Sequence, residues 1–398
     1  MDAVILGNGR SGQAAAALLR RDGWRVRILD GDDPWQDDTC DLCVASPGVS
    51  ASHPWQTAAH AAGVPVISEL QLGAERYRAM GGDMLAVTGS KGKSSVVKLV
   101  ADALGGIPCG NYGTPLCEVV ANLQPSPLNP QLKWAVVEVS SFQMEATTLP
   151  PDTFAAAAIL NLQEDHLDRH GSVEAYHALK RKLLGFSKVK VMGTGPDRNV
   201  GTDPETERND SALFAGSYFD NPVLRDNGLC AVALLRAAGL GDAVISAAFS
   251  RFEPLPHRMQ TVGTFNGVTW IDDSKATSIA ALVAGVKMAA FRVSQSAPRV
   301  RLIAGGLPKG DDPGVAVGCL ARDVRKVYLI GQCASLLEKA WRDAVPCEVC
   351  GTLERAVASA RRDAAHGDCV LLSPGAASFD QFKSYGERGD RFAGFLKR

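Results

Sequence analysis

The chain has 398 residues, of which 46 % are hydrophobic and 21 % are charged, with a formal net charge of -1. This length is too great for one ordinary hydrophobic core and indicates two or three domains. A near-neutral chain without a run of Lys or Arg offers no basic surface to nucleic acid, and no apolar stretch approaches the length of a membrane span. We therefore expect a soluble enzyme that binds neither nucleic acid nor a membrane.

Ten cysteines are spread along the chain, many of them inside apolar runs. This distribution is typical of reduced core residues in a cytoplasmic protein. Two CxxC pairs occur, Cys40 with Cys43 and Cys347 with Cys350, but they lie far apart and neither has a histidine beside it. A zinc or redox role is the alternative that these pairs leave open.

The first segment, residues 1–81, alternates short apolar runs with helical patterns. Runs at 3–6, 25–29 and 42–45 predict strands, and residues 11–22 predict a helix. The first run has no basic flank, so we expect a buried strand there and not a signal peptide. The alternation predicts a parallel α/β unit.

A glycine pattern, Gly7-x-Gly9-x-x-Gly12, lies between the first strand and the first helix of this segment, and Asp30 closes the second strand. This is the fingerprint of dinucleotide-binding domains, so a dehydrogenase is one interpretation. The pattern indicates the fold better than the ligand, because the same geometry binds any diphosphate.

A phosphate-binding loop opens the second segment, residues 82–253. Thr88–Ser95 reads TGSKGKSS and lies between the apolar run 84–87 and a helical pattern. Glycines let backbone N–H groups surround phosphate oxygens, Lys93 can reach the outer phosphates, and Ser94 can offer a hydroxyl to Mg²⁺. Val87 takes the place of the motif's leading glycine, so a plain glycine turn is the alternative.

Two polar strand ends follow in the same segment. The buried run that begins at Ala135 ends in Glu138, and the run 155–160 leads into a polar stretch that contains His166. Because parallel strands end at the same edge of a sheet, we expect both side chains near Lys93 and Ser94, as a Mg²⁺ site. The alternative for Glu138 is a capping or salt-bridged carboxylate.

The third segment, residues 254–398, contains further βα patterns. Lys275 and Lys309 fall at the ends of predicted strands, where a cation would face a ligand crevice; solvated surface lysines are the alternative. No second nucleotide loop occurs in this segment. We therefore expect a substrate-binding lid.

The motifs occur in the order TGSKGKSS, GNYGTP, EVSSFQME, NLQEDHLDRHG with Lys180 downstream, PHR, DDSKAT, GGLPKG and SPGAASFDQF. This series resembles the Mur ligase family of peptidoglycan synthesis over nearly the whole chain, in the branch that adds glutamate to UDP-N-acetylmuramoyl-L-alanine. The resemblance implies a three-domain α/β fold: a Rossmann-like UDP-substrate domain (1–81), a P-loop ATP domain (82–253) and a Rossmann-like amino-acid domain (254–398). It also implies a cytoplasmic ligase that uses ATP and two Mg²⁺ ions and forms an acyl phosphate.

The resemblance assigns residues to each ligand. Those implied for the UDP-sugar are Gly9, Arg10, Ser11, Ser46, Pro47, Gly48 and Asn111. Those implied for ATP are Thr88, Gly89, Ser90, Lys91, Gly92, Lys93, Ser94, Ser95, Arg258, Asp273 and Lys275. Those implied for glutamate are Thr277, Lys309, Ser378 and Phe379. Those implied for Mg²⁺ are Ser94, Glu138, His166 and, if carbamylated, Lys180; the catalytic set is Lys93, His166, Lys180 and Lys275.

The resemblance further implies that the third domain closes over the site and excludes water from the acyl phosphate. An unmodified Lys180 would be an ordinary charged residue of a helix expected over 173–184. Three departures stand out: Lys91 where the family commonly has Asn, Leu307 where several relatives have Asp, and Gly375-Ala376 in place of Ala-Cys. Leu307 lies at the amino-acid end of the expected site.

The amino acid therefore stays open between D-glutamate, which we favour, and L-glutamate. A folylpolyglutamate synthetase-like ligase also adds glutamate, but it would lack the N-terminal α/β unit. A nucleotide-binding regulatory protein is the alternative from another class. We expect a monomer, because three domains must move relative to one another.

Overall fold

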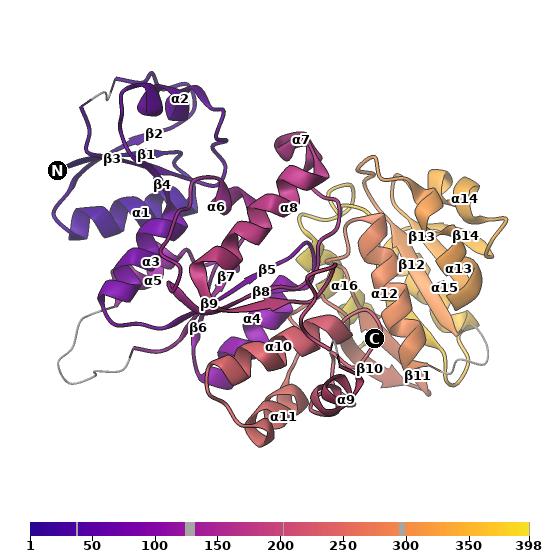
Figure 1. Ribbon diagram of the computed structural model, residues 1–398. Coiled ribbons are helices and arrows are strands. Elements are labelled where there is room, and N and C mark those ends of the chain that lie inside the picture. Colours follow the sequence, from indigo (N-terminus) through magenta and orange to yellow (C-terminus); the bar gives the residue numbers. More distant parts are fainter. Residues whose placement is uncertain (37–38, 124–131, 202, 294–298, 398) are drawn as a thin grey trace. The chain divides into compact units, whose positions relative to one another are not determined.

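The computed structural model describes residues 1–36, 39–123, 132–201, 203–293 and 299–397 (Figure 1). The chain divides into two compact units, the first made of Met1–Asp220 with Leu224–Phe252 and the second of Glu253–Arg398 with Asn221–Val223. Three sheets follow one another along the chain, two in the first unit and one in the second. The predicted α/β fold with parallel strands is confirmed. Over the described ranges, no helix combines the length and apolarity that crossing a membrane requires.

The first sheet has four parallel strands in the order β2-β1-β3-β4. Its strands are β1 (Asp2–Leu6), β2 (Arg25–Leu29), β3 (Leu42–Ala45) and β4 (Val66–Ser68), and its helices are α1 (Arg10–Arg21), α2 (Pro54–Ala61) and α3 (Glu69–Ala79). Pro54 begins α2, where its missing N–H leaves no bond unmade, and the Ser68 hydroxyl caps α3 by accepting from the backbone N–H of Gln71. The three strands expected in this segment are confirmed within a residue.

The second sheet has five parallel strands in the order β6-β7-β5-β8-β9. Its strands are β5 (Met84–Thr88), β6 (Ile107–Gly110), β7 (Ala135–Glu138), β8 (Phe154–Ile159) and β9 (Ser187–Met192). The helices along this part of the chain are α4 (Lys93–Leu104), α5 (Leu116–Asn122), α6 (Ser141–Glu145), α7 (Leu167–His170), α8 (Val173–Lys182), η1 (Leu183–Phe186), α9 (Pro204–Ala212), α10 (Arg225–Ala237) and α11 (Asp242–Arg251). Central strand β5 is buried along its whole length, which explains its unbroken apolar sequence.

One hydrophobic core joins the two sheets of the first unit. It contains Ile5 of the first sheet, Leu70 of α3, and Ala86 and Val137 of the second sheet. Helices α1, α3 and α5 pack against one another (Figure 1). Burial of these apolar side chains, at roughly 25 cal/mol for each Å² removed from water, therefore holds both sheets in one compact unit.

The third sheet has the order β10-β11-β15-β12-β13-β14. Its strands are β10 (Gln260–Phe265), β11 (Val268–Asp272), β12 (Val300–Gly305), β13 (Val324–Ile330), β14 (Cys347–Gly351) and β15 (Cys369–Leu372). Its helices are α12 (Ile279–Arg292), η2 (Pro313–Ala316), α13 (Val317–Asp323), α14 (Ala334–Trp341), α15 (Leu353–Asp363) and α16 (Tyr385–Leu396). Strand β10 is antiparallel to β11, and Asn266 and Gly267 between them have φ of 52° and 75°, as a tight hairpin requires.

The strands β11, β12 and β15 end at the same edge of this sheet, because they are parallel neighbours. The turns that follow these strands carry the DDSKAT, GGLPKG and SPGAASF motifs. On one face, Trp270, Val370 and Leu372 form a core with Leu353 of α15 and Phe392 of α16. This packing places α16 beside the strand ends.

Candidate active site

The phosphate loop connects the end of β5 to the beginning of α4. Gly92 has φ of 83°, a conformation that glycine adopts without strain, and Lys93 begins the helix. The Lys93 ammonium donates to the carbonyl oxygens of Gly89 (2.8 Å) and Ser90 (3.2 Å). The positive end of a helix and a lysine therefore lie together, which is the arrangement that binds phosphate.

Asn161, which follows β8, holds this loop in place. Its side-chain oxygen accepts from the Lys91 backbone N–H (2.8 Å), and its side-chain nitrogen donates to the Lys91 carbonyl (2.9 Å). Its own carbonyl accepts from the Ser90 backbone N–H at 3.0 Å. Asn227 of α10 packs against Gly92 of the phosphate loop so closely that a Cβ added at Gly92 would lie 2.1 Å from the Asn227 side-chain nitrogen. Neither Asn161 nor Asn227 was among the residues predicted from the sequence.

Glu138 ends β7 and is 3 % exposed. One carboxylate oxygen accepts from the Asn111 side-chain nitrogen at 2.8 Å. The other oxygen is buried and has no hydrogen-bond partner among the described residues. A buried carboxylate oxygen without a partner is costly, and a bound cation would remove that cost. Asn111, implied for the UDP-sugar, thus contacts the residue implied for the metal.

Lys180 of α8 is 2 % exposed and packs against the phosphate loop. Its ammonium donates to the Gly89 carbonyl (3.0 Å) and the Thr88 hydroxyl (3.5 Å), and it lies 4.6 Å from the centre of the Tyr176 ring. Burial and, to a smaller extent, the charge of Lys93 lower the pKa of Lys180 to about 7, against the pull of nearby carboxylates. Burial therefore sets Lys180 apart from the exposed lysines of ordinary amphipathic helices. Helix α8 ends at Lys182, and η1 continues the helical turn expected to 184.

His166 caps α7 with a left-handed backbone (φ 53°). Its ring centre lies 4.8 Å from that of Phe142 and 6.2 Å from that of Tyr176, and its Nε2 lies 3.7 Å from the Asp165 carboxylate. The Tyr176 hydroxyl in turn lies 3.2 Å from the Ser90 hydroxyl of the phosphate loop. His166 is thus linked to the loop through Tyr176, while a metal shell shared with Glu138 stays a prediction.

Except for Asn111, which follows β6 of the second sheet, the residues implied for the UDP-sugar lie at the strand ends of the first sheet. The Ser46 hydroxyl donates to the Gly7 carbonyl at 3.0 Å, and a Cβ at Gly12 would lie 2.0 Å from that carbonyl oxygen. Gly12 therefore allows α1 to approach the first turn closely. Arg10 pairs with Glu118 of α5 through two contacts of 3.2 Å. Gly9 caps α1, Ser11 lies in its first turn, and Pro47 and Gly48 lie in the turn after β3.

Arg169 of α7 connects these turns to the second sheet. Its guanidinium donates to both oxygens of Glu145 (2.9 and 2.7 Å) and to the Val49 carbonyl (3.3 Å). The Phe142 ring lies beneath it, with a distance of 4.5 Å from the ring centre. The segment that carries His166 is thus fixed to the turn that follows β3.

In the second unit, the structure brings two of the residues implied for glutamate, Thr277 and Lys309, into contact. Lys309 donates to the Thr277 hydroxyl at 3.1 Å, across the turns that follow β12 and β11. Leu307 and Ala377 exchange backbone hydrogen bonds of 2.9 and 3.0 Å, which join the turns after β12 and β15. Ser378 is buried, whereas Phe379 is 70 % exposed.

Asp273 and Lys275 follow β11 in the same unit. Asp273 is buried and accepts from the Ser373 hydroxyl (2.8 Å) and the Met259 backbone N–H (3.2 Å), and burial raises its pKa to about 7. Its carboxylate thus secures the backbone next to Arg258. The Lys275 ammonium lies 4.0 Å from the centre of the ring of Tyr385, a residue that was not predicted from the sequence.

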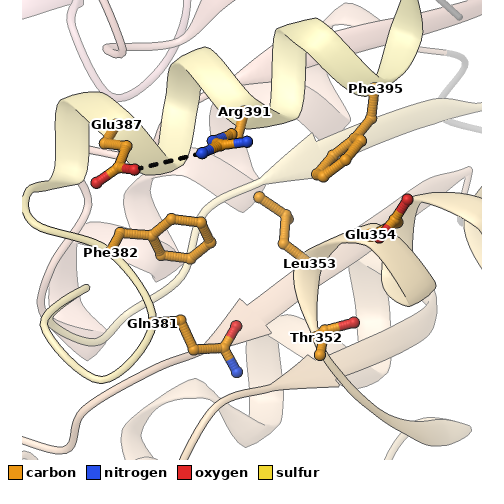
Figure 2. A pocket seen from close by; sticks show the side chains of 8 residues that line it. All are labelled: Thr352, Leu353, Glu354, Gln381, Phe382, Glu387, Arg391 and Phe395. Carbon is orange, nitrogen blue, oxygen red and sulfur yellow. Dashed lines mark ion pairs between the residues drawn. The ribbon is translucent and has the colours of Figure 1, made fainter.

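A pocket of ≈ 440 Å³ lies between α15, α16 and the end of the SFDQF segment (Figure 2). It is lined by Thr352, Leu353, Glu354, Gln381, Phe382, Glu387, Arg391 and Phe395. The Gln381 side chain donates to the Gly351 carbonyl at 2.7 Å. None of the residues implied for a ligand lines this pocket.

The cysteines of the described residues are all free. The Cys40 and Cys43 sulfur atoms lie 3.8 Å apart, and Cys347 and Cys350 both belong to β14. Within the described part of the chain, no group of three or more His, Cys, Asp and Glu side chains is placed to hold a metal ion.

A parallel sheet, a phosphate loop with two converging lysines and an adjoining buried carboxylate define an ATP-using α/β enzyme. Residues 87–194 match the Mur ligase middle domain, and residues 257–375 match the Mur ligase glutamate ligase domain. The chain belongs to the Mur ligase family. The UDP-N-acetylmuramoylalanine–D-glutamate ligase of Frankia casuarinae is 36 % identical to it, with 99 % of this chain and 93 % of the relative covered.

A second relative with the same name, from Gloeobacter violaceus, is 35 % identical over 99 % of this chain and 98 % of its own length. The MurF ligase of Thermotoga maritima, solved in complex with ADP, has a TM-score of 0.58 at 14 % identity, with 90 % of this chain and 95 % of that chain covered. This structural likeness supports the fold alone. The sequence relatives support the glutamate branch that the motifs indicated.

Proposed function

We propose that this enzyme joins D-glutamate to the carboxylate of UDP-N-acetylmuramoyl-L-alanine at the expense of ATP, in the synthesis of peptidoglycan precursors. The observation that carries the proposal is that Lys93 and Lys180 both donate to the Gly89 carbonyl, at 2.8 and 3.0 Å. Glu138, near these lysines, has one buried carboxylate oxygen without a hydrogen-bond partner among the described residues. Two near-full-length relatives named for this reaction favour it over L-glutamate or a folate-type substrate.

The chemistry accounts for the charges at the phosphate loop. The substrate carboxylate attacks the γ-phosphorus of ATP, the bond to the β-phosphate oxygen breaks, and an acyl phosphate forms. The glutamate amine then attacks the acyl carbon, loses a proton, and inorganic phosphate leaves as the amide forms. The first step brings two anions together, so the cation of Lys93 and the helix end at α4 lower its barrier.

We propose that Ser94, Glu138, His166 and a carbamylated Lys180 hold the Mg²⁺ ions. The buried, unpartnered Glu138 oxygen fits this role, because an oxygen ligand aimed at a cation is satisfied only when the cation binds. Bound Mg²⁺ supplies positive charge to the phosphoryl oxygens. Lys180 fits carbamylation, because it is buried against the loop and its lowered pKa leaves much of the amine uncharged and nucleophilic at neutral pH.

We further infer one role for each of the three segments of the chain. Residues 1–81 bind the UDP-sugar through Gly9, Arg10, Ser11, Ser46, Pro47 and Gly48, with Asn111 from the next segment. Residues 82–253 bind ATP, and residues 254–398 bind glutamate through Thr277, Lys309, Ser378 and Phe379 and contribute Arg258, Asp273 and Lys275 to ATP. The contact between Lys309 and Thr277 supports the glutamate assignment, because a cation beside a hydroxyl suits a carboxylate.

The test is phosphate release from ATP in the presence of UDP-N-acetylmuramoyl-L-alanine with D-glutamate, L-glutamate or no amino acid. We expect release that requires the UDP-sugar and D-glutamate together. Release that requires L-glutamate would correct the amino acid. Release that is independent of the UDP-sugar would refute the proposed function.

A further inference from the structure

Arg388, one turn into α16, is a fully buried cation, with 0 % of its surface exposed. Its Nε donates to the Ser274 hydroxyl (2.9 Å), and Nη2 donates to the Ser274 carbonyl (2.9 Å). Nη1 and Nη2 both donate to the Ala376 carbonyl (3.1 Å each), and Nη1 donates to the Ala377 carbonyl (3.3 Å). Burial lowers the pKa of Arg388 to about 10, so the group is still charged at neutral pH.

These bonds join two turns at the strand ends of the third sheet. Ser274 directly precedes Lys275 after β11, and Ala377 directly precedes Ser378 after β15. The backbone pairing of Ala377 with Leu307 extends the connection to the turn after β12, which carries Lys309. One guanidinium therefore joins two turns directly, and the backbone pairing of Ala377 with Leu307 connects them to a third.

The geometry also shows what Arg388 cannot do. A guanidinium has five N–H donors, and each of the five hydrogen bonds above uses one of them. No donor is left for a substrate carboxylate, and the side chain has no exposed surface through which to reach one. Arg388 thus acts on the site through the backbone that it holds.

Gly306 shows how closely the turns approach this side chain. A Cβ at Gly306 would lie 2.2 Å from the Ala377 carbonyl oxygen and 3.2 Å from Arg388 Nη1. Lysine could not replace the arginine, because an ammonium has three donors at one point, whereas these acceptors require a planar fork.

We propose that Arg388 is a positioning residue for the amino-acid substrate, which sets the spacing between Thr277, Lys309 and Ser378 so that they fit a dicarboxylic amino acid. The inference rests on the proposed function for the identity of that substrate. By this proposal, a residue of α16, outside the turns that carry the motifs, determines the shape of the glutamate pocket.

Helix α16 provides matched controls. Arg391, on the same helix, lines the pocket between α15 and α16 and pairs there with Glu387 at 3.8 Å (Figure 2). Phe392 is buried against Trp270 at 6.0 Å between ring centres, so its truncation costs packing energy without removing a hydrogen bond. Arg391→Met controls for loss of charge, and Phe392→Leu controls for loss of stability.

The experiment compares steady-state kinetics of Arg388→Met and Arg388→Lys with the two controls. We expect both Arg388 variants to raise the KM for glutamate at least about tenfold, more than the KM for ATP, while the KM for the UDP-sugar stays within about twofold, because misplaced substrate-binding groups weaken binding steeply. Both controls should keep the wild-type KM for glutamate. An unchanged KM for glutamate in Arg388→Met, or an equal rise in Phe392→Leu, would overturn the proposal.

Amide hydrogen exchange tests the positioning role without catalysis. In Arg388→Met, the amides of Leu307 and Ala377 should exchange at least about tenfold faster than in the wild type, while amides inside β12 and β15 keep their rates. Equal exchange at Leu307 and Ala377 would refute the role of Arg388. Wild-type phosphate release reports separately on the proposed function, so the two failures are distinguishable.

Discussion

Replacing Lys180 with Met should make the protein more stable and inactive, and the gain in stability should depend on pH. Lys180 is buried, and its pKa falls from 10.5 to about 7 on folding. Between these values the unfolded chain binds more protons at this site than the folded one, so the wild type becomes more stable as pH rises from 7 towards 10.5. Methionine fills about the same space and does not titrate, so position 180 adds no pH dependence to the stability of Lys180→Met.

The expected size follows from the two pKa values. Linkage gives a penalty for Lys180 of about 4 kcal/mol at pH 7 and about 2 kcal/mol at pH 9, because each tenfold weakening of proton binding corresponds to about 1.4 kcal/mol. The stability advantage of Lys180→Met should therefore shrink by about 2 kcal/mol over this range. That corresponds to a change of about 4–8 °C in the difference between the two melting temperatures.

The assay is thermal unfolding of both proteins at pH 7 and pH 9, without Mg²⁺ and in buffer depleted of CO₂, so that the amine is unmodified. Asp273 and Glu69, whose pKa values burial also shifts to about 7, are common to both proteins and cancel in the difference. A stability difference that is the same at both pH values would refute the argument. Retained ligase turnover in Lys180→Met would refute the role of Lys180 in metal binding.

Four other substitutions test separate parts of the site. Lys93→Ala should reduce ATP turnover at least about 100-fold, which phosphate release measures. Lys309→Ala should raise mainly the KM for glutamate, and equal losses for glutamate and ATP would contradict its role. Glu138→Gln should raise the Mg²⁺ concentration for half-maximal activity about tenfold or more, whereas Glu118→Gln, at a half-buried carboxylate of α5, should not. Asn161→Ala should raise the KM for ATP, because the backbone of Lys91 loses both hydrogen bonds to the Asn161 side chain. An unchanged KM for ATP would show that Asn161 does not hold the phosphate loop in place.

Most strands that the sequence predicted correctly are buried, and the exception is the edge strand β2, in which Arg25 and Arg27 are exposed. Strand β5 is covered on both faces, and its unbroken apolar run is typical of a central parallel strand. The edge strands β6, β9 and β14 were not predicted, because Pro108, alternating lysines and a short mixed sequence weaken the signal there. The hairpin of β10 was missed as well, although Asn266-Gly267 is a hairpin signal.

The same division holds for the site. Lys93 and Lys309 could be named in advance from short local patterns, and Lys180 from the family resemblance. Asn161 and Arg388 could not, since their roles depend on which backbone groups the fold places beside them. The hydrogen bonds of this buried arginine go to carbonyls and a hydroxyl, and the charges of Asp272 and Asp380 act on it from sites distant in the sequence, so no local pattern reveals it.

The positions of the buried charges suggest why they persist despite their cost. Lys93 and Lys180 both donate to the Gly89 carbonyl, and their mutual repulsion adds to burial in lowering the pKa of Lys180. Carbamylation would relieve that repulsion, because it replaces the second cation with an anion that Lys93 attracts. The new oxygen atoms and the unpartnered oxygen of Glu138 would then offer Mg²⁺ the hard ligands that it prefers. The cost of burying these charges thus favours the modification and the metal together.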